Sequence, residues 1–213
     1  MNKKLFILKM LIVIFMLLLG IYYYPILPST MPIHWNYMWV ADNFASKEKA
    51  IFIFPWIAFI LLLLLQILPK LDPKKENYPK FEKAWEAFQF ALLIFFLYAY
   101  SLTIFATLYT INMWQYMMFW LWILFMVLGN YMWKIRRNYF VGIRLPWTID
   151  NEDVWNKTHR LWWKMFMLAG FLFLVNAFLN FNPAMVIIPI IFLILFFPIV
   201  YSYIIFKRLT VKK

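Results

Sequence analysis

Six long apolar blocks are the feature of this sequence that most restricts its fold. Their approximate limits are residues 5–24, 51–69, 86–109, 114–133, 163–181 and 184–206. An α-helix needs about 20 apolar residues to cross a hydrocarbon core of roughly 30 Å. Each block has about that length, so the sequence predicts an all-α integral membrane protein with six transmembrane helices.

The amino-acid composition supports this class. Hydrophobic residues make up 66% of the 213 positions and charged residues only 14%, whereas soluble proteins average about 45–50% and about 25%. A soluble fold of this size could not keep so much apolar surface out of water. The chain has no cysteine, which excludes disulfides, thiolate metal sites and a cysteine nucleophile.

The first block follows the basic start "MNKK" and could be mistaken for a secretory signal. The apolar region of such a signal is only about 7–15 residues long and ends at a small-residue cleavage site. Here the apolar run is longer and ends in "YYYPILP". We therefore expect the first block to be a retained helix.

The distribution of basic residues predicts an orientation. With the N-terminus inside, 19 of the 21 Lys and Arg residues fall on the inner side, and only Lys47 and Lys49 fall outside. The inner set includes Lys9 and, in the tail, Lys212 and Lys213. The positive-inside rule then predicts an N-in, C-in topology. It also accounts for the net charge of +12, so no direct nucleic-acid partner is expected.

The central parts of the six blocks contain no Asp, Glu, Lys, Arg or His. Such residues usually mark ion paths or proton relays, so this pattern argues against an ion-coupled transporter. The polar residues within the blocks are assigned to helix–helix hydrogen bonds; they are Gln66, Gln89, Ser101, Thr103, Thr107 and Asn176. Three prolines each remove a backbone donor and can kink a helix; they are Pro55, Pro189 and Pro198.

The sequence carries no HExxH, Walker or GxSxG motif. The two histidines, His34 and His159, are expected on opposite faces of the membrane, where they cannot share a metal ion or a catalytic site. We therefore predict that the protein is not an enzyme and has no catalytic residue, metal site or cofactor.

The outer segment, residues 25–50, carries the first polar cluster. Pro32 ends the helical pattern, and His34 and Asn36 follow with groups that both donate and accept hydrogen bonds. Asp42 is expected to pair with one of them. Two interpretations remain open: an ordered lid whose polar groups satisfy one another, or a contact site for a ligand.

The inner segment, residues 134–164, carries the second polar cluster. Its first basic residues are expected at the lipid headgroups; they are Lys134, Arg136 and Arg137. Gly142 is the expected position of positive φ, and Pro146 biases Leu145 toward an extended backbone. The segment is therefore expected to form a turn, an extended piece and a short cytoplasmic helix before the fifth span.

Capping residues predict two helix starts. In "DNFASKEKA", Ser46 is the candidate N-cap of a helical lead-in to the second span, with Glu48 in the first turn. In "TIDNEDVWNKTHR", Thr148 or Asp150 is expected to cap the short inner helix.

These two polar segments resemble the SdpI family of six-span bacterial membrane proteins, preceded by a module of the DUF1648 type. The inner motif residues are Asn130, Asn138, Gly142, Arg144, Pro146, Trp147, Thr148, Trp155, Thr158, His159 and Arg160. The outer motif residues are Pro32, His34, Asn36 and Asp42. The sequence departs from the family near Trp39, where the family usually has a glycine.

The resemblance divides the chain into two modules. Residues 1–83 form the DUF1648-like module, with spans 1 and 2, the outer loop 25–50 and the inner loop 70–83. Residues 84–213 form the SdpI-like module, with spans 3 to 6 and the inner loop 134–164.

The resemblance also implies a function in the bacterial cytoplasmic membrane. It implies an immunity protein or receptor that protects the cell from a secreted, membrane-active peptide toxin. It further implies that the inner face sequesters a small cytoplasmic autorepressor. The expected partners are the lipid bilayer, the peptide toxin and this repressor, and the motif residues of both faces are the expected binding residues.

Three alternatives stay open beside this function. The first is an envelope enzyme, or a protein that binds lipid or phosphate through Arg144, His159 and Arg160. The second is a small-solute transporter. In the third the inner motif is purely structural, and arginines pair with acids to hold the loop shut; the residues are Arg144 and Arg160 with Asp150, Glu152 or Asp153.

Overall fold

The computed structural model describes residues 3–210 of the chain. Its helices are α1 (Lys3–Tyr23), α2 (Lys47–Leu71), α3 (Glu82–Leu108), α4 (Met113–Met132), α5 (Pro146–Asp150), α6 (Glu152–Leu179), α7 (Pro183–Ile191) and α8 (Phe197–Thr210). Two strands, β1 (Thr30–Trp35) and β2 (Ala41–Ser46), lie between α1 and α2. Tyr24–Ile26 and Lys75–Phe81 form 3₁₀ turns, and a π-helical turn, Phe192–Phe196, joins α7 to α8.

Six helical segments within the described residues are long and apolar enough to cross a membrane. They are Lys3–Ile26, Lys47–Leu71, Lys75–Leu108, Met113–Met132, Glu152–Leu179 and Pro183–Thr210. Large apolar side chains such as Phe178 and Met185 are 70% and 75% exposed, as expected for a surface that faces lipid. The predicted class of an all-α, multi-pass membrane protein is therefore confirmed.

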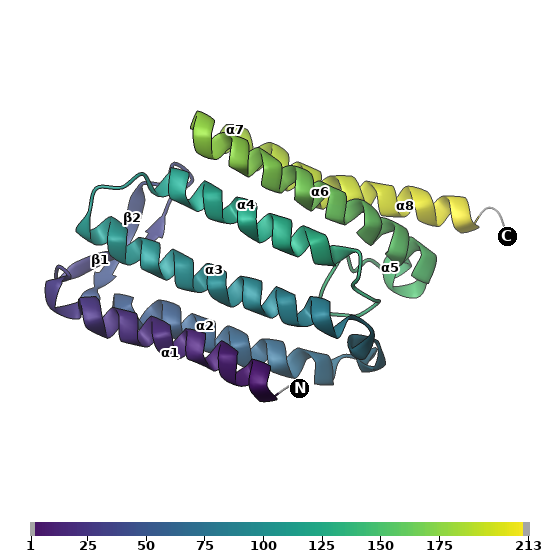
Figure 1. The fold of residues 1–213 in the computed structure, drawn as a ribbon. Coiled ribbons are helices and arrows are strands. Elements are labelled where there is room, and N and C mark those ends of the chain that lie inside the picture. The colour runs from purple at the N-terminus through teal and green to yellow at the C-terminus, as the bar shows by residue number, and fades with distance from the viewer. Residues whose placement is uncertain (1–2, 211–213) are drawn as a thin grey trace.

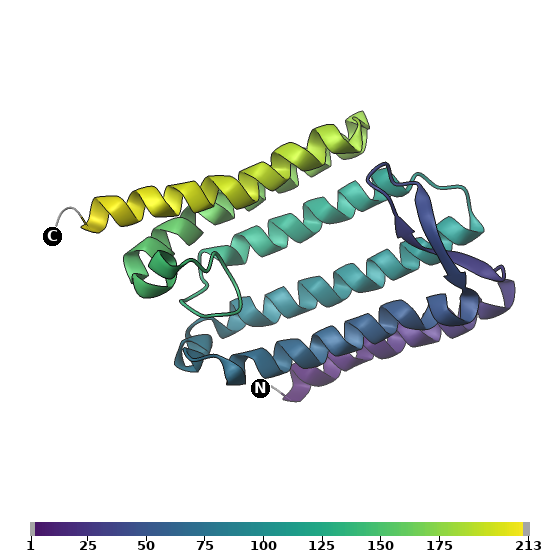
Figure 2. The same cartoon turned by 180° about the vertical axis from the view of Figure 1, so that it is seen from behind.

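The long helices run side by side, with α1 paired with α2 at one side of the bundle and α6 with α7 and α8 at the other. The hairpin β1–β2 lies at one end of the bundle and α5 at the opposite end (Figures 1 and 2). Helices α1, α2 and α3 contact one another, α4 packs between α3 and α6, and α8 packs on α6. The predicted N-in, C-in orientation would put the hairpin outside and α5 inside. It stays a prediction, and Lys212 and Lys213, which contribute to it, lie outside the described residues.

The contact between α4 and α6 depends on small residues. A Cβ on Gly129 of α4 would lie 3.0 Å from Phe166 of α6, and one on Gly170 of α6 would lie 3.3 Å from Phe125 and Met126 of α4. Small residues at such positions let membrane helices approach closely and gain van der Waals contact.

The predicted start of the second helix after Ser46 is confirmed, and residues 41–46 before it form a strand that was not predicted. This stretch is strand β2, which pairs antiparallel with β1 from Thr30↔Ser46 to Trp35↔Ala41. The pairing satisfies backbone hydrogen-bonding groups of both strands. Ser46 is the N-cap residue of α2, as expected, although its side chain makes no capping hydrogen bond.

One charged residue is buried within a span, near its end rather than at its centre. Lys9, which the charge count placed among the inner basic residues, lies within α1 and is only 1% exposed. It forms an ion pair with Glu86 near the start of α3. Sequence alone could not show this pair, because its two partners meet only when α1 packs on α3.

Candidate functional site

The inner loop between α4 and α5 is organised around Asn138, whose side chain is fully buried. Its Nδ2 donates to the carbonyls of Arg136 and Val141 at 2.9 and 3.0 Å. Its Oδ1 accepts from the backbone N–H groups of Phe140 and Val141 at 2.9 and 2.7 Å. One asparagine therefore fixes the turn of this loop.

Gly142 and His159 form the next layer of the inner loop. Gly142 has a φ of 115°, as predicted, and a Cβ there would overlap His159 Nε2. The close approach lets the backbone N–H of Ile143 donate to His159 Nε2 at 3.2 Å. His159 Nδ1 then donates to the carbonyl of Trp155 at 2.9 Å. These two bonds require the neutral, Nδ1-protonated form of the ring.

Trp155 anchors this histidine. Its ring is fully buried and stacks on His159 with a centroid distance of 4.1 Å. Its Nε1 donates to the carbonyl of Ile135 at 2.8 Å. The contact joins the segment after α4 to the first turn of α6. Trp155 and His159 lie one helical turn apart, and this spacing serves packing.

Thr148 closes the loop onto α5. Its hydroxyl accepts from the backbone N–H of Leu145 at 2.9 Å and donates to the carbonyl of Ile143 at 2.6 Å. Leu145 is extended, with φ −102° and ψ 154°, as its position before Pro146 predicted. Pro146 takes the first position of α5, where no backbone N–H is needed.

The expected helix caps need a correction. The inner helix that continues into the fifth span is α6, and neither Thr148 nor Asp150 caps it. Asn151 does so: its side chain accepts from the backbone N–H groups of Asp153 and Val154 at 2.9 and 3.1 Å. Asn151 is extended, which ends α5 and starts α6, so the short inner helix and the fifth span meet at this residue.

Trp147 ties the loop to the last span. Its Nε1 donates to Ser202 Oγ of α8 at 2.9 Å, and its ring packs edge-on against Tyr203 at 5.4 Å. The inner motif therefore holds α4, α6 and α8 together at one end of the bundle.

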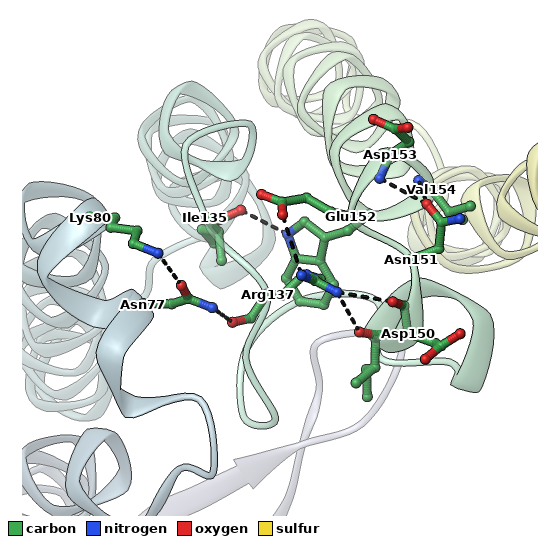
Figure 3. Close-up of polar contacts among 11 residues, drawn as sticks. Asn77, Lys80, Ile135, Arg137, Asp150, Asn151, Glu152, Asp153 and Val154 are labelled. Atoms are coloured by element: carbon green, nitrogen blue, oxygen red, sulfur yellow. Dashed lines mark hydrogen bonds and ion pairs between the residues drawn. The ribbon is translucent and has the colours of Figure 1, made fainter.

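Among the described residues, Arg137 is the arginine that forms an ion pair with an acid (Figure 3). Its guanidinium donates to the carbonyl of Asp150 at 3.0 Å and to Glu152 Oε2 at 3.3 Å. Arg144, which was expected to make such a pair, donates instead to the carbonyl of Tyr139 at 2.9 Å. The loop is held shut as the structural interpretation predicted, but by a different arginine.

Two further residues that support the loop were not predicted. Asn77 Nδ2 donates to the carbonyl of Arg137 at 2.9 Å (Figure 3). Asp72 is 2% exposed and accepts from the Tyr78 hydroxyl at 3.0 Å and from the backbone N–H of Tyr139 at 2.9 Å. Both lie in the turn between α2 and α3, so they link the two expected modules.

The remaining inner motif residues lie apart from this network. Asn130 is exposed on α4 and lines a groove beside α3. Arg160 is exposed on α6. Thr158 is fully buried. Because His159 is buried and both its nitrogens are engaged, it cannot form an exposed phosphate site with Arg144 and Arg160.

The outer motif is partly structural. His34 Nδ1 and Asp42 Oδ1 are 2.6 Å apart across the hairpin, which settles which residue pairs with Asp42. Asn36 Oδ1 accepts from the backbone N–H groups of Met38 and Val40 at 2.9 and 3.1 Å. Trp39 has a φ of 59°, a left-handed conformation that favours glycine, at the place where the family usually has one.

An outer cavity lies between the hairpin and the turn that joins α3 to α4. It has a volume of about 630 Å³, and its walls include Trp35, Trp39, Phe44 and Trp114. Trp114 is 5% exposed, and its Nε1 has no hydrogen-bond partner among the described residues. Pro32 also lines this cavity, so the outer motif and the aromatic side chains meet at one site.

Comparisons with known proteins confirm the resemblance. Residues 134–202 match the SdpI/YfhL protein family, and residues 11–59 match a domain of unknown function, DUF1648. The chain is 27% identical over 172 residues to the immunity protein SdpI of Bacillus subtilis (strain 168), a match that covers 81% of each chain. No solved structure matches the chain.

Proposed function

We propose that this protein is a non-enzymatic immunity protein that protects a bacterial membrane from a secreted, membrane-active peptide. The observation that carries the proposal is the similarity to the Bacillus subtilis immunity protein SdpI, which extends over 81% of both chains. The loop network supports a role without catalysis, because the polar groups of Asn138, Thr148 and His159 are engaged in holding the backbone.

We assign contact with the peptide to the outer cavity. Its aromatic walls, with Trp35 and Trp39, can bury apolar peptide side chains. Phe44 and Val40 are 57% and 60% exposed on the same hairpin, and they extend the apolar surface. The unpaired Nε1 of Trp114 can donate to a peptide carbonyl.

We assign contact with a small cytoplasmic autorepressor to the inner face. A cleft of about 530 Å³ opens there, and its basic residues are Lys74, Lys80, Arg136 and Arg137. Its acidic residues, Glu76 and Glu152, are fewer. An acidic surface of the repressor would complement this cleft. In this proposal both modules contribute to both sites. The DUF1648-like module, residues 1–83, supplies the hairpin wall of the outer cavity and part of the inner cleft, and the SdpI-like module, residues 84–213, supplies the remaining residues of each.

A survival assay tests the proposed immunity. A peptide-sensitive bacterium that expresses the chain is challenged with a secreted, membrane-depolarising peptide, and survivors are counted. We expect wild type to protect, and Trp39→Ala to protect less at equal membrane abundance. Trp133→Ala is the matched control, because Trp133 is exposed just after α4, at the other end of the bundle. Equal killing with and without the wild-type chain would refute immunity to that peptide.

A further inference from the structure

A buried polar cluster joins α1, α2 and α3 near the end of the bundle that carries α5. Lys9 Nζ forms an ion pair with Glu86 and donates to Gln89 Oε1 at 2.7 Å. Gln66 donates to the same oxygen. Gln66 lies five residues before the end of α2 and Gln89 seven after the start of α3. At about 1.5 Å per residue, the cluster is roughly 7–10 Å inside the helix ends.

The orientation of the Gln89 amide follows from this cluster. Its Oε1 must face Lys9 and Gln66, because the opposite orientation would set its N–H groups against two other donors. The Gln89 Nε2 group therefore points away from Lys9 and Gln66. It is buried and has no hydrogen-bond partner among the described residues. A buried donor without an acceptor is costly, so a bound oxygen atom would stabilise it.

A cavity of about 420 Å³ adjoins this amide, with Gln66 and Gln89 in its wall. Its charged lining residues are Lys70, Lys75, Glu82 and Glu86. Glu86 is already paired with Lys9, which leaves Lys70 and Lys75 for an anionic group and Glu82 for a cationic group. A ligand that carries both groups fits this arrangement better than a simple anion. The remaining walls are largely apolar and include Trp85, Pro69 and Pro79.

We propose that this cavity binds a phosphoethanolamine group, carried by a phospholipid of the adjacent leaflet. The phosphate oxygens accept from Gln89, Lys70 and Lys75, and the ammonium donates to Glu82. The apolar walls and the place at the ends of membrane helices favour a lipid over a soluble zwitterion. This site is independent of the proposed immunity function.

Native mass spectrometry of the full chain in detergent tests the proposal. The probes are phosphatidylethanolamine, phosphatidylglycerol, phosphatidylcholine and free phosphoethanolamine. We expect one phosphatidylethanolamine to bind about tenfold more tightly than the other two lipids. Free phosphoethanolamine is expected to bind far more weakly. Equal binding of the three lipids would overturn the site, and equal binding of the free zwitterion would overturn the lipid source.

Exposed residues at the rim give variants that should fold normally. Lys75→Gln and Glu82→Gln are each expected to weaken phosphatidylethanolamine binding about tenfold. Lys83→Gln is the matched control, because Lys83 is exposed on the same helix but does not line the cavity. Gln89→Leu should also weaken binding. Unchanged binding in both rim variants would refute the proposal.

Discussion

At the scale of single residues, the inner motif is a set of backbone supports. Gly142 is required because its φ of 115° and the nearby His159 ring leave no room for a side chain. His159 is required as an acceptor for the N–H of Ile143. The positive φ of Gly142 and the extended backbone of Leu145 could be predicted from the sequence, because both depend on local backbone preferences. The pairing of Arg137 could not be predicted, because several arginines and acids in the loop were equally near in sequence.

His159→Ala should destabilise the protein. It leaves the buried N–H of Ile143 without an acceptor, which typically costs about 1–3 kcal/mol. The unfolding free energy, measured by denaturant titration in micelles, should fall by about that amount. His34→Ala is the control: its pair with Asp42 is exposed, at 64% and 41%, and exposed pairs contribute only about 0–1 kcal/mol. A larger loss in His34→Ala would contradict the assigned role of His159.

Gly142→Ala should be more damaging than Gly170→Ala. At Gly142 the backbone has a positive φ that residues with a Cβ rarely adopt, and this strain alone costs about 1–3 kcal/mol. The new Cβ would also overlap the His159 ring. At Gly170 the nearest atoms, in Phe125 and Met126, are 3.3 Å away. The same denaturant titration compares the two variants. Equal stability would show that the inner loop tolerates a side chain at residue 142.

At the scale of helices, two prolines are compensated by aromatic side chains from neighbouring helices. Pro55 cannot donate to the carbonyl of Ile51 four residues earlier, and the Tyr100 hydroxyl donates to that carbonyl at 3.0 Å. Pro198 likewise leaves the carbonyl of Ile194 without its i+4 donor, and Trp162 Nε1 donates to it at 2.8 Å. In a membrane, freed backbone groups need such internal partners.

Tyr100→Phe tests this compensation. The variant keeps the ring but removes the donor, so the carbonyl of Ile51 stays buried and unpaired. We expect the unfolding free energy to fall by about 1–3 kcal/mol. Tyr22→Phe, at a side chain 76% exposed, is the control and should change little. An equal loss in the two variants would mean that the hydroxyl of Tyr100 does not support α2.

The helices could be predicted from the sequence, and several contacts could not. The predicted limits of the six spans agree with the structure to within a few residues at most ends, because length and hydropathy are local properties of the sequence. The largest difference is at α6, which begins at Glu152 because Asn151 caps it. The hairpin and the Lys9–Glu86 pair depend on segments meeting in space. Local capping patterns therefore predicted the start of α2 at Ser46, but neither the hairpin nor the Lys9–Glu86 pair could be predicted.

At the scale of the whole molecule, the two polar clusters lie at opposite ends of the helices (Figure 1). The hairpin with its aromatic cavity is at one end, and the inner loop with its basic cleft is at the other. A signal from a bound peptide to the inner face would require the peptide to bind one arrangement of the helices better than another.

Single cysteines test which end faces outward. The chain has no cysteine of its own, so Tyr37→Cys and Asp150→Cys each supply one reactive thiol at an exposed position. We expect a membrane-impermeant maleimide to label residue 37 in intact cells and to label residue 150 only after lysis. Labelling of residue 150 from outside would overturn the predicted N-in topology.

The most direct test of the proposed immunity is the membrane potential of living cells during peptide exposure. Cells with the chain, with Trp39→Ala or with an empty vector receive the same depolarising peptide, and a voltage-sensitive dye reports the potential. The proposed function predicts that the wild-type chain preserves the potential, that the variant preserves it less, and that the vector does not preserve it. Equal depolarisation in all three would contradict protection of the membrane by this protein.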